Sequence, residues 1–167
     1  GFYKKLMLFS RKNGVETYID LTGDYLNACL KSGASNVKIN ACEFSDFSGL
    51  KPNIENIKKI YLEYRRYGLK RLIITDKHNP TIAVAKDCVY RVVPPEIKNF
   101  VSGVGAGDSF MAGFVYCASS NRKIDESLKF ATACASSDCA TLGAGIIRKS
   151  DLNRFYRKIS VEKVEEL

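Results

Sequence analysis

The segment Val101-Ser102-Gly103-Val104-Gly105-Ala106-Gly107-Asp108-Ser109-Phe110 is the most informative part of this chain. It lies between an extended, proline-containing stretch and an apolar run of helical spacing, so we expect a helix to start within it. Glycine lets the main chain approach a ligand closely, and the unpaired N–H groups and dipole of a helix start favour an anion. Asp108 could accept the proton of an attacking hydroxyl while these N–H groups hold a phosphate. A glycine turn followed by a helix-stabilising Asp is the structural alternative.

The same tripeptide recurs at Gly143 to Gly145. There it lacks the acid and follows a predicted helix, so it is typical of a helix terminator. The position of the tripeptide at a helix start, and not its sequence alone, therefore carries the phosphate-binding signal.

Length and composition indicate one globular domain. The chain has 167 residues, of which 46% are hydrophobic and 26% charged, and these are ordinary values for such a domain. No apolar stretch approaches the length of a membrane span, and no secretory pattern opens the chain. The six cysteines form no Cys-x-x-Cys pair and His78 is the only histidine. We therefore expect a cytoplasmic protein without disulfides, a zinc site or a membrane partner.

The net charge of +8 permits an anionic partner, either nucleic acid or a small phosphate. A nucleic-acid-binding protein would bind with a steep salt dependence. The basic residues are scattered, however, and their densest groups are only pairs: Lys4-Lys5, Lys58-Lys59 and Arg65-Arg66. This pattern favours a solvated surface, and we expect no nucleic-acid partner.

Hydrophobic periodicity predicts strands that alternate with helices. The predicted strands are Val15–Ile19, Ser35–Ile39, Leu72–Thr75, and a hairpin of Thr81–Ala85 and Cys88–Val93 after a turn at Asp76–Pro80. The predicted helices cover Asp24–Lys31, Asn53 to Gly68, the run after Gly107, the run from Asp125, and Asp151 to about Ile159. This order predicts a three-layer α/β fold with a mostly parallel sheet. Ligands collect at the carboxyl ends of such strands, where Asp20, Asn40, Glu43 and Thr75 fall.

Several of these features appear in an order that resembles the C-terminal half of ribokinase-like (phosphofructokinase-B type) sugar kinases. The segment from Val101 to Phe114 resembles the second signature of that family. Phe130 to Ala135, continued to Gly143-Ala144, is similar to its final nucleotide-side helix and loop. Lys38-Ile39-Asn40-Ala41-Cys42-Glu43 is similar to its Asn-x-x-Glu element, and Asp20 to Gly23 to its Asp-Thr/Ser-Gly stretch. The residues of the Lys-x-Asn-x-x-Glu and Val-Gly-Ala-Gly-Asp-Ser motifs are most similar to those of 1-phosphofructokinases and tagatose-6-phosphate kinases.

The resemblance implies a role for each matching residue. Asp108 would be the general base, and the N–H groups of Gly105, Ala106 and Gly107 would form an anion hole for the transferred phosphoryl group. Asn40 and Glu43 would organise Mg²⁺ with its water shell. The residues that would face a phosphate or the nucleotide are Lys38, Thr75, Thr132 and Gly143.

Most of these residues also have a structural interpretation. Asn40 and Glu43 could cap the chain after a strand, and Lys38 could be a solvated lysine. Thr75 could simply end its strand. Thr132 could be a core residue whose hydroxyl bonds back to its own helix. Only Asp108 with its glycines stands clearly above such an alternative.

The chain also departs from the family pattern. Thr75-Asp76-Lys77-His78-Asn79-Pro80 replaces a Ser/Thr-x-Gly-x-x-Gly element and loses both glycines. Gly103 stands in place of the usual Thr, and Ile39 in place of a Pro. The N-terminal half of the family, which carries most sugar contacts and a β-sheet lid, is not represented in residues 1–167.

The resemblance implies that residues 1–167 form the nucleotide-binding and catalytic part of an ATP- and Mg²⁺-dependent kinase, which phosphorylates a hydroxyl of a sugar or sugar phosphate. The alternative is a degenerate relative that binds a nucleotide or sugar phosphate without catalysis, which the missing glycines favour. Without the lid strands, an exposed sheet edge could pair two copies into a homodimer.

Overall fold

A computed structural model describes residues 1–86 and 88–167. Asp87, half of the predicted Lys86-Asp87 turn, lies outside this part. In the described residues there are seven helices: α1 (Phe2–Lys12), α2 (Gly23–Lys31), α3 (Ala41–Ser48), α4 (Ile54–Arg65), α5 (Ala106–Ser119), α6 (Ile124–Cys139) and α7 (Lys149–Tyr156). The six strands are β1 (Tyr18–Ile19), β2 (Asn36–Asn40), β3 (Arg71–Asp76), β4 (Asn79–Ala85), β5 (Cys88–Val93) and β6 (Ser160–Glu166).

The strands form one sheet in the order β1-β2-β3-β4-β5-β6. β2 runs parallel to β1 and to β3, and its last residue, Asn40, lies opposite Thr75. Only two residues, Lys77 and His78, connect β3 to β4, and a connection this short joins antiparallel neighbours. The predicted α/β class is confirmed, with the parallel part of the sheet in its first three strands.

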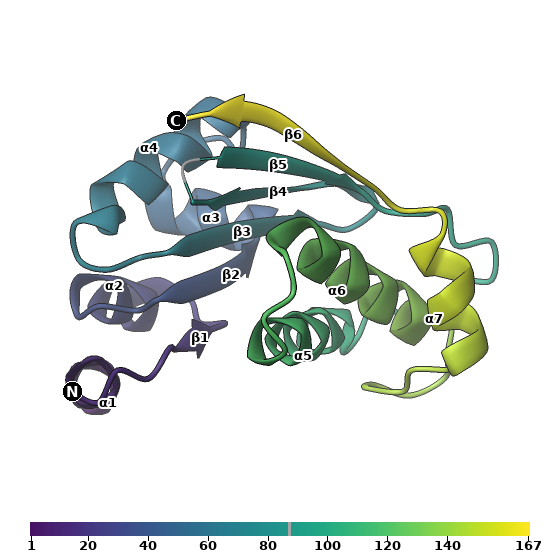
Figure 1. The fold of residues 1–167 in the computed structure, drawn as a ribbon, viewed down its shortest axis with the longest axis horizontal. Coiled ribbons are helices and arrows are strands. Elements are labelled where there is room, and N and C mark those ends of the chain that lie inside the picture. The colour runs from purple at the N-terminus through teal and green to yellow at the C-terminus, as the bar shows by residue number, and fades with distance from the viewer. Residues whose placement is uncertain (87) are drawn as a thin grey trace. The chain divides into compact units, whose positions relative to one another are not determined.

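The chain divides into two compact units, which are described separately. The first comprises Gly1–Asp76, Ile82–Val89 and Val164–Leu167. Within it α3 packs against β2 and β3, α4 against β3, and α1 against α2 (Figure 1). Its apolar core includes Leu26, Val37, Ile57, Tyr61 and Tyr64. The two tyrosines are thus part of the core, as their helical spacing predicted.

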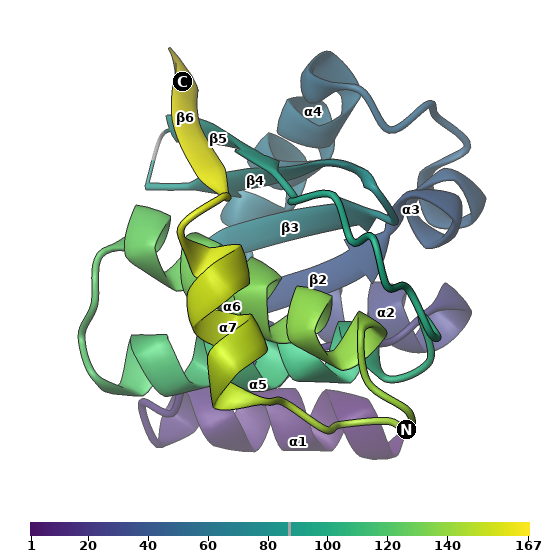
Figure 2. The same ribbon diagram turned by 90° about the vertical axis from the view of Figure 1, so that its right-hand side faces the viewer.

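The second unit comprises Lys77–Thr81 and Tyr90–Lys163. In it α6 packs against both α5 and α7 (Figure 2). Gly113 permits the close approach of α5 to α6, because a Cβ there would lie 2.8 Å from Sγ of Cys134. Phe110 and Phe114 stack with their ring centres 6.4 Å apart. All six cysteines of the chain are free thiols.

Several predicted boundaries were wrong, and local hydrogen bonds explain two of them. The strand predicted from Val15 begins at Tyr18, because the N–H of Val15 bonds to the carbonyl of Ser10 and closes the end of α1. The helix predicted to reach Gly68 ends at Arg65, because the N–H of Leu69 already bonds to the carbonyl of Tyr64.

The turn predicted at Asp76–Pro80 is shorter, since β3 includes Asp76 and β4 begins at Asn79. The last helix ends at Tyr156 instead of Ile159. Three elements were not predicted: α1, α3 and β6. Across the part of the chain that the structure describes, no helix is both long enough and apolar enough to cross a membrane.

Candidate functional site

The glycine turn before α5 leaves backbone donors unpaired. Gly105 is the N-cap of α5 and has a left-handed backbone with φ of 89°. The hydroxyl of Ser102 accepts from the N–H of Val104 at 3.1 Å, and the carbonyl of Gly103 accepts from the N–H of Ala106 at 3.3 Å. In residues 1–86 and 88–167 nothing accepts from the N–H groups of Gly105, Gly107 and Asp108. Three donors at a helix start are thus available to an anion.

Gly105 is enclosed by the second glycine turn. A Cβ on Gly105 would lie 2.7 Å from Cβ of Ala144 and 2.9 Å from Oδ2 of Asp138. The fold therefore brings the two Gly-Ala-Gly tripeptides together in one unit. A left-handed backbone and a neighbour on the side of the missing Cβ both require glycine at this position.

Asp108 is the third residue of α5 and is exposed. A negative charge in the first turn of a helix is stabilised by the helix dipole. The predicted base is thus an accessible carboxylate one residue beyond the glycine turn.

In the first unit, Asp20, which follows β1, forms an ion pair with Lys38 in the middle of the adjacent strand β2. Nζ of Lys38 donates to Oδ2 of Asp20 at 2.5 Å. Lys38 is only 5% exposed, so the interpretation of Lys38 as a solvated lysine was wrong. A buried ammonium group needs a partner to offset its desolvation, and Asp20 supplies one. An ammonium group has three donors, so this bond does not exclude a phosphate contact.

Asn40 and Glu43 form a capping box at the start of α3. Oδ1 of Asn40 accepts from the N–H of Glu43 at 3.0 Å, and Oε2 of Glu43 accepts from the N–H of Asn40 at 2.8 Å. Such a reciprocal pair satisfies two donors at the helix start. The structural alternative for the Asn-x-x-Glu element is therefore present in the fold.

The capping box still fits an indirect magnesium role. Mg²⁺ keeps several waters and needs one or two carboxylates, and Oε1 of Glu43 bonds to no described residue. Within residues 1–86 and 88–167, no three His, Cys, Asp or Glu side chains gather in a group that could hold a metal ion. Asn40 and Glu43 could thus orient metal-bound water, and they do not form a complete ligand cage.

The remaining predicted residues lie in different environments. Thr75 is half-buried and lies opposite Asn40 across the parallel strands, so these two meet at one strand end. Thr132 is 5% exposed, and its hydroxyl donates to the carbonyl of Leu128 at 2.8 Å, as expected for a back-bonded core residue. Gly143 is exposed with φ of 100°.

Sequence reasoning missed Ser137 and Asp138, which are buried at the end of α6 beside the second glycine turn. Asp138 is the one charged residue in the stretch Ala131 to Leu142, and a charge within such an uncharged helical run is a signal that could have identified this pair.

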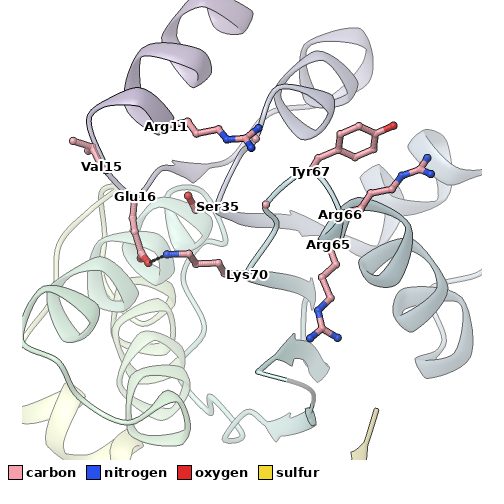
Figure 3. A pocket seen from close by; sticks show the side chains of 11 residues that line it. Arg11, Val15, Glu16, Ser35, Arg65, Arg66, Tyr67 and Lys70 are labelled. Atoms are coloured by element: carbon pink, nitrogen blue, oxygen red, sulfur yellow. Dashed lines mark hydrogen bonds and ion pairs between the residues drawn. The ribbon is translucent and has the colours of Figure 1, made fainter.

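A separate pocket of about 300 Å³ lies in the first unit and contains none of the predicted site residues (Figure 3). Ser35 and Lys70, which line it, precede β2 and β3. It therefore lies at the amino ends of strands whose carboxyl ends carry Asn40 and Thr75. Its lining residues are Arg11, Gly14, Val15, Glu16, Gly33, Ser35, Arg65, Arg66, Tyr67, Gly68 and Lys70.

Glu16 is the one acid in that lining and is held by cations. Lys70 donates to it at 2.6 Å and Arg71 at 3.3 Å. Burial acts to raise the pKa of Glu16, but the hydrogen bond from Lys70 and the charges of Arg71 and Lys70 outweigh it and lower the pKa to about 2. Because ligands of parallel sheets bind at the opposite, carboxyl ends of the strands, this pocket is not part of the candidate site.

Comparison with known proteins identifies the group to which this architecture is related. The model of the pfkB family carbohydrate kinases matches residues 3–150. The chain is 29% identical over 157 residues to a 1-phosphofructokinase of Borreliella burgdorferi, and 28% identical over 153 residues to one of Haemophilus influenzae. These matches cover 93% and 91% of the chain but 50% and 49% of the relatives. The chain thus spans about half the length of the curated relatives it matches.

Solved structures agree with this relationship. Phosphofructokinase-2 from Escherichia coli, in complex with potassium, superimposes with a TM-score of 0.82 at 25% identity, over 93% of this chain and 51% of that one. Arabidopsis thaliana ribokinase, complexed with ribose and ATP, superimposes with a TM-score of 0.80 at 20% identity, over 93% of this chain and 52% of that one. The predicted ribokinase-like α/β fold is confirmed.

Proposed function

Because the chain belongs to the pfkB family of carbohydrate kinases, we propose that it forms the nucleotide-binding and catalytic part of an enzyme that transfers a phosphoryl group from ATP to a hydroxyl of a sugar or sugar phosphate. The observation that carries this proposal is the start of α5. Unpaired N–H groups of Gly105 and Gly107 stand beside the accessible carboxylate of Asp108. Phosphoryl transfer needs such a combination of a base and preorganised donors.

Each residue has one role in this mechanism. Asp108 accepts the proton of the acceptor hydroxyl as that oxygen attacks the phosphorus. The N–H groups of the turn stabilise the charge on the transferred phosphoryl oxygens. Ala106 contributes less than its neighbours, because its N–H already bonds to Gly103.

The strand ends of the first unit would serve the nucleotide. Mg²⁺, when bound, would supply positive charge that offsets the charge of the phosphates. Asn40 and Glu43 would orient its water shell, and Lys38 would contribute a point charge while keeping Asp20 as its partner. In the first unit, Thr75, beside Asn40, would face the nucleotide. In the second unit, Gly143 would have a nucleotide-binding role. Thr132 has only its position in the family motif in support of such a role.

Two observations support ATP and a sugar as the substrates. The matching family consists of carbohydrate kinases, and a ribokinase of the same fold was solved with ribose and ATP. Names of relatives favour a phosphorylated hexose as the acceptor. A cytoplasmic location and a homodimer stay predictions.

A degenerate relative that binds nucleotide without catalysis is the second candidate. The connection between β3 and β4 favours it, because Lys77 adopts a left-handed backbone with φ of 49° where the family pattern would place a glycine-rich element. This turn cannot approach a nucleotide as closely as glycines would.

The test requires a protein with both halves of the kinase fold, made from the longest native reading frame or by joining residues 1–167 to the N-terminal half of a relative. Asp108→Asn should lower kcat by about 100- to 10,000-fold, the usual contribution of a general base. ATP binding, measured by calorimetry, should survive. The matched control is Asp125→Asn, since Asp125 is also exposed in the first turn of a helix but follows no glycine turn.

The outcomes separate the candidates. Transfer that Asp108→Asn abolishes, with Asp125→Asn unaffected, supports the kinase. Full activity of Asp108→Asn removes the proposed mechanism. ATP binding without product in the unaltered protein favours the degenerate relative.

A further inference from the structure

The last turn of α6 carries two polar side chains that are almost fully buried: Ser137 is 0% exposed and Asp138 is 1% exposed. Buried polar groups cost free energy unless they are hydrogen-bonded. Oδ1 of Asp138 accepts from the N–H of Ile146 at 2.9 Å, and Oγ of Ser137 accepts from the N–H of Arg148 at 3.0 Å. Both side chains therefore hold the segment that follows the second glycine turn.

The same helix end also holds the segment that leads into the first glycine turn. The carbonyl of Cys139 accepts from the N–H of Val101 at 2.8 Å and from that of Ser102 at 3.3 Å. Ser102 in turn accepts from the N–H of Val104. The end of α6 is thus bonded to both chain segments that meet at Gly105.

The second carboxylate oxygen of Asp138 faces the glycine turn. Oδ2 is buried without a hydrogen-bond partner among the described residues. It lies 2.9 Å from the position where Gly105 would carry a Cβ. An unpaired buried carboxylate oxygen is costly, so stability alone does not account for an Asp at this position.

We propose that Ser137 and Asp138 are positioning residues, which hold the Gly143–Gly145 turn against Gly105 and thereby fix the direction of the N–H groups of Gly105 and Gly107. Without these bonds Ala144 is free to move away, and the left-handed Gly105 loses the contact that limits its backbone. The catalytic consequence rests on the proposed function, whereas the structural consequence does not.

The structural test uses the 167-residue chain and compares Asp138→Ala, Asp138→Asn and Ser137→Ala by amide NMR and hydrogen exchange. In Asp138→Ala the Ile146 amide should exchange about tenfold faster, as expected for the loss of one hydrogen bond. The resonances of Gly105, Ala106 and Gly107 should move with it. Asp138→Asn should restore both, because the amide oxygen can still accept from Ile146.

Ser136→Ala is the matched control. Ser136 is 4% exposed on the same helix, but its hydroxyl donates to the carbonyl of Thr132 at 2.8 Å and, among the described residues, forms no hydrogen bond with either glycine turn. It should leave the amides of Gly105–Gly107 unchanged. The proposal is overturned if Asp138→Ala and Ser137→Ala leave the Gly105–Gly107 resonances unmoved, or if Ser136→Ala moves them equally.

The catalytic test uses the protein with both halves of the fold. Asp138→Ala should lower kcat by up to about 100-fold, a usual cost of a small misplacement, while KM for the sugar stays near its original value and Asp138→Asn recovers most of kcat. A rise in KM without a change in kcat would contradict a positioning role. If the unaltered protein transfers no phosphate, the proposed function fails, and the NMR comparison still decides the structural claim.

Discussion

Two helices of this chain begin beside residues that the family motif marks as functional, and they begin in opposite ways. α3 starts with a capping box, in which Asn40 and Glu43 satisfy each other's N–H groups. α5 starts with Gly105, which has no side chain, and the donors of Gly105, Gly107 and Asp108 bond to no described residue. A helix start has a fixed number of unpaired donors. At the start of α3, side chains satisfy two of these donors. At the start of α5, three donors have no acceptor among the described residues.

This difference changes how strongly the Asn-x-x-Glu motif and the Gly-Ala-Gly-Asp motif each support a functional role. The capping box stabilises α3 whether or not a metal binds, so the Asn-x-x-Glu element alone is weak support for a metal site. At the start of α5, which we call the open start because three of its N–H groups bond to no described residue, no side chain caps the helix and stabilises it in this way. Gly105 is required by its left-handed backbone and its close neighbours. Gly107 lies within the first turn of α5, where glycine is unfavourable, so we propose a ligand-binding role for Gly107.

The largest effect should follow from adding a methyl group to the open start. Gly105→Ala should lower the free energy of unfolding by about 2 to 5 kcal/mol, since an L-residue in a left-handed backbone costs about 1 to 2 kcal/mol and an overpacked contact about 1 to 3 kcal/mol. The contact is with Cβ of Ala144 at 2.7 Å. Urea unfolding of the 167-residue chain measures the loss.

Gly145→Ala is the control for this substitution. Gly145 also has a left-handed backbone, with φ of 75°, but a Cβ there would meet nothing within 4 Å. It should cost only the backbone term of about 1 to 2 kcal/mol. Equal losses for the two variants would show that the fit between the turns does not matter.

A smaller loss of stability is expected at the start of α3, which we call the closed start because its capping box satisfies two N–H groups. Asn40→Ala should lower the free energy of unfolding by about 1 kcal/mol, the usual cost of losing an N-cap side chain. Glu43→Gln should cost little, because the Gln side-chain oxygen can still accept from the N–H of Asn40. Thermal unfolding of both variants provides the measurement.

Asn53→Ala is a second reference for the closed start, because Asn53 caps α4 through the N–H of Asn56 and belongs to no predicted site. If Asn40 acts only as a cap, the two Ala variants should behave alike in every assay. Loss of Mg²⁺-dependent ATP binding in Asn40→Ala but not in Asn53→Ala would separate a metal role from capping.

The sequence predicted those elements whose burial follows a clear period. In α4 the buried residues Ile57, Ile60, Tyr61 and Tyr64 are spaced as a helix requires. The centre of β3 was also predicted, because the apolar run Leu72–Thr75 is typical of a buried parallel strand. The glycine turn was predicted from the identity of its residues alone, because glycine acts through backbone geometry and Asp108 through its charge.

The sequence analysis missed β6, α1 and α3. The reasons are contacts between residues distant in sequence, a masked hydrophobic pattern, and a motif that was interpreted as a metal site instead of a helix cap. β6 is mostly charged, and ion pairs of Glu162 with Arg91 and of Glu165 with Lys58 accompany it. In α1 the exposed Phe2 and Phe9 obscure the buried face. α3 could have been found, since Asn40-x-x-Glu43 followed by the buried Phe44 is itself a capping-box signature.

Asp108→Asn in the 167-residue chain should have the smallest effect on stability. It also tests most directly whether the N–H groups at the open start bind an anion. Losing a charge from the first turn of α5 should cost only about 0.3 to 1 kcal/mol. Inorganic phosphate, titrated by NMR, should shift the amides of Gly105 and Gly107 and leave those of Cys42 and Glu43 in place. Asp108→Asn should bind phosphate about threefold to tenfold more tightly, because a like charge near the anion is removed. Shifts at α3, or weaker binding by the variant, would mean that the α5 donors are not the anion site and that Asp108 does not face it.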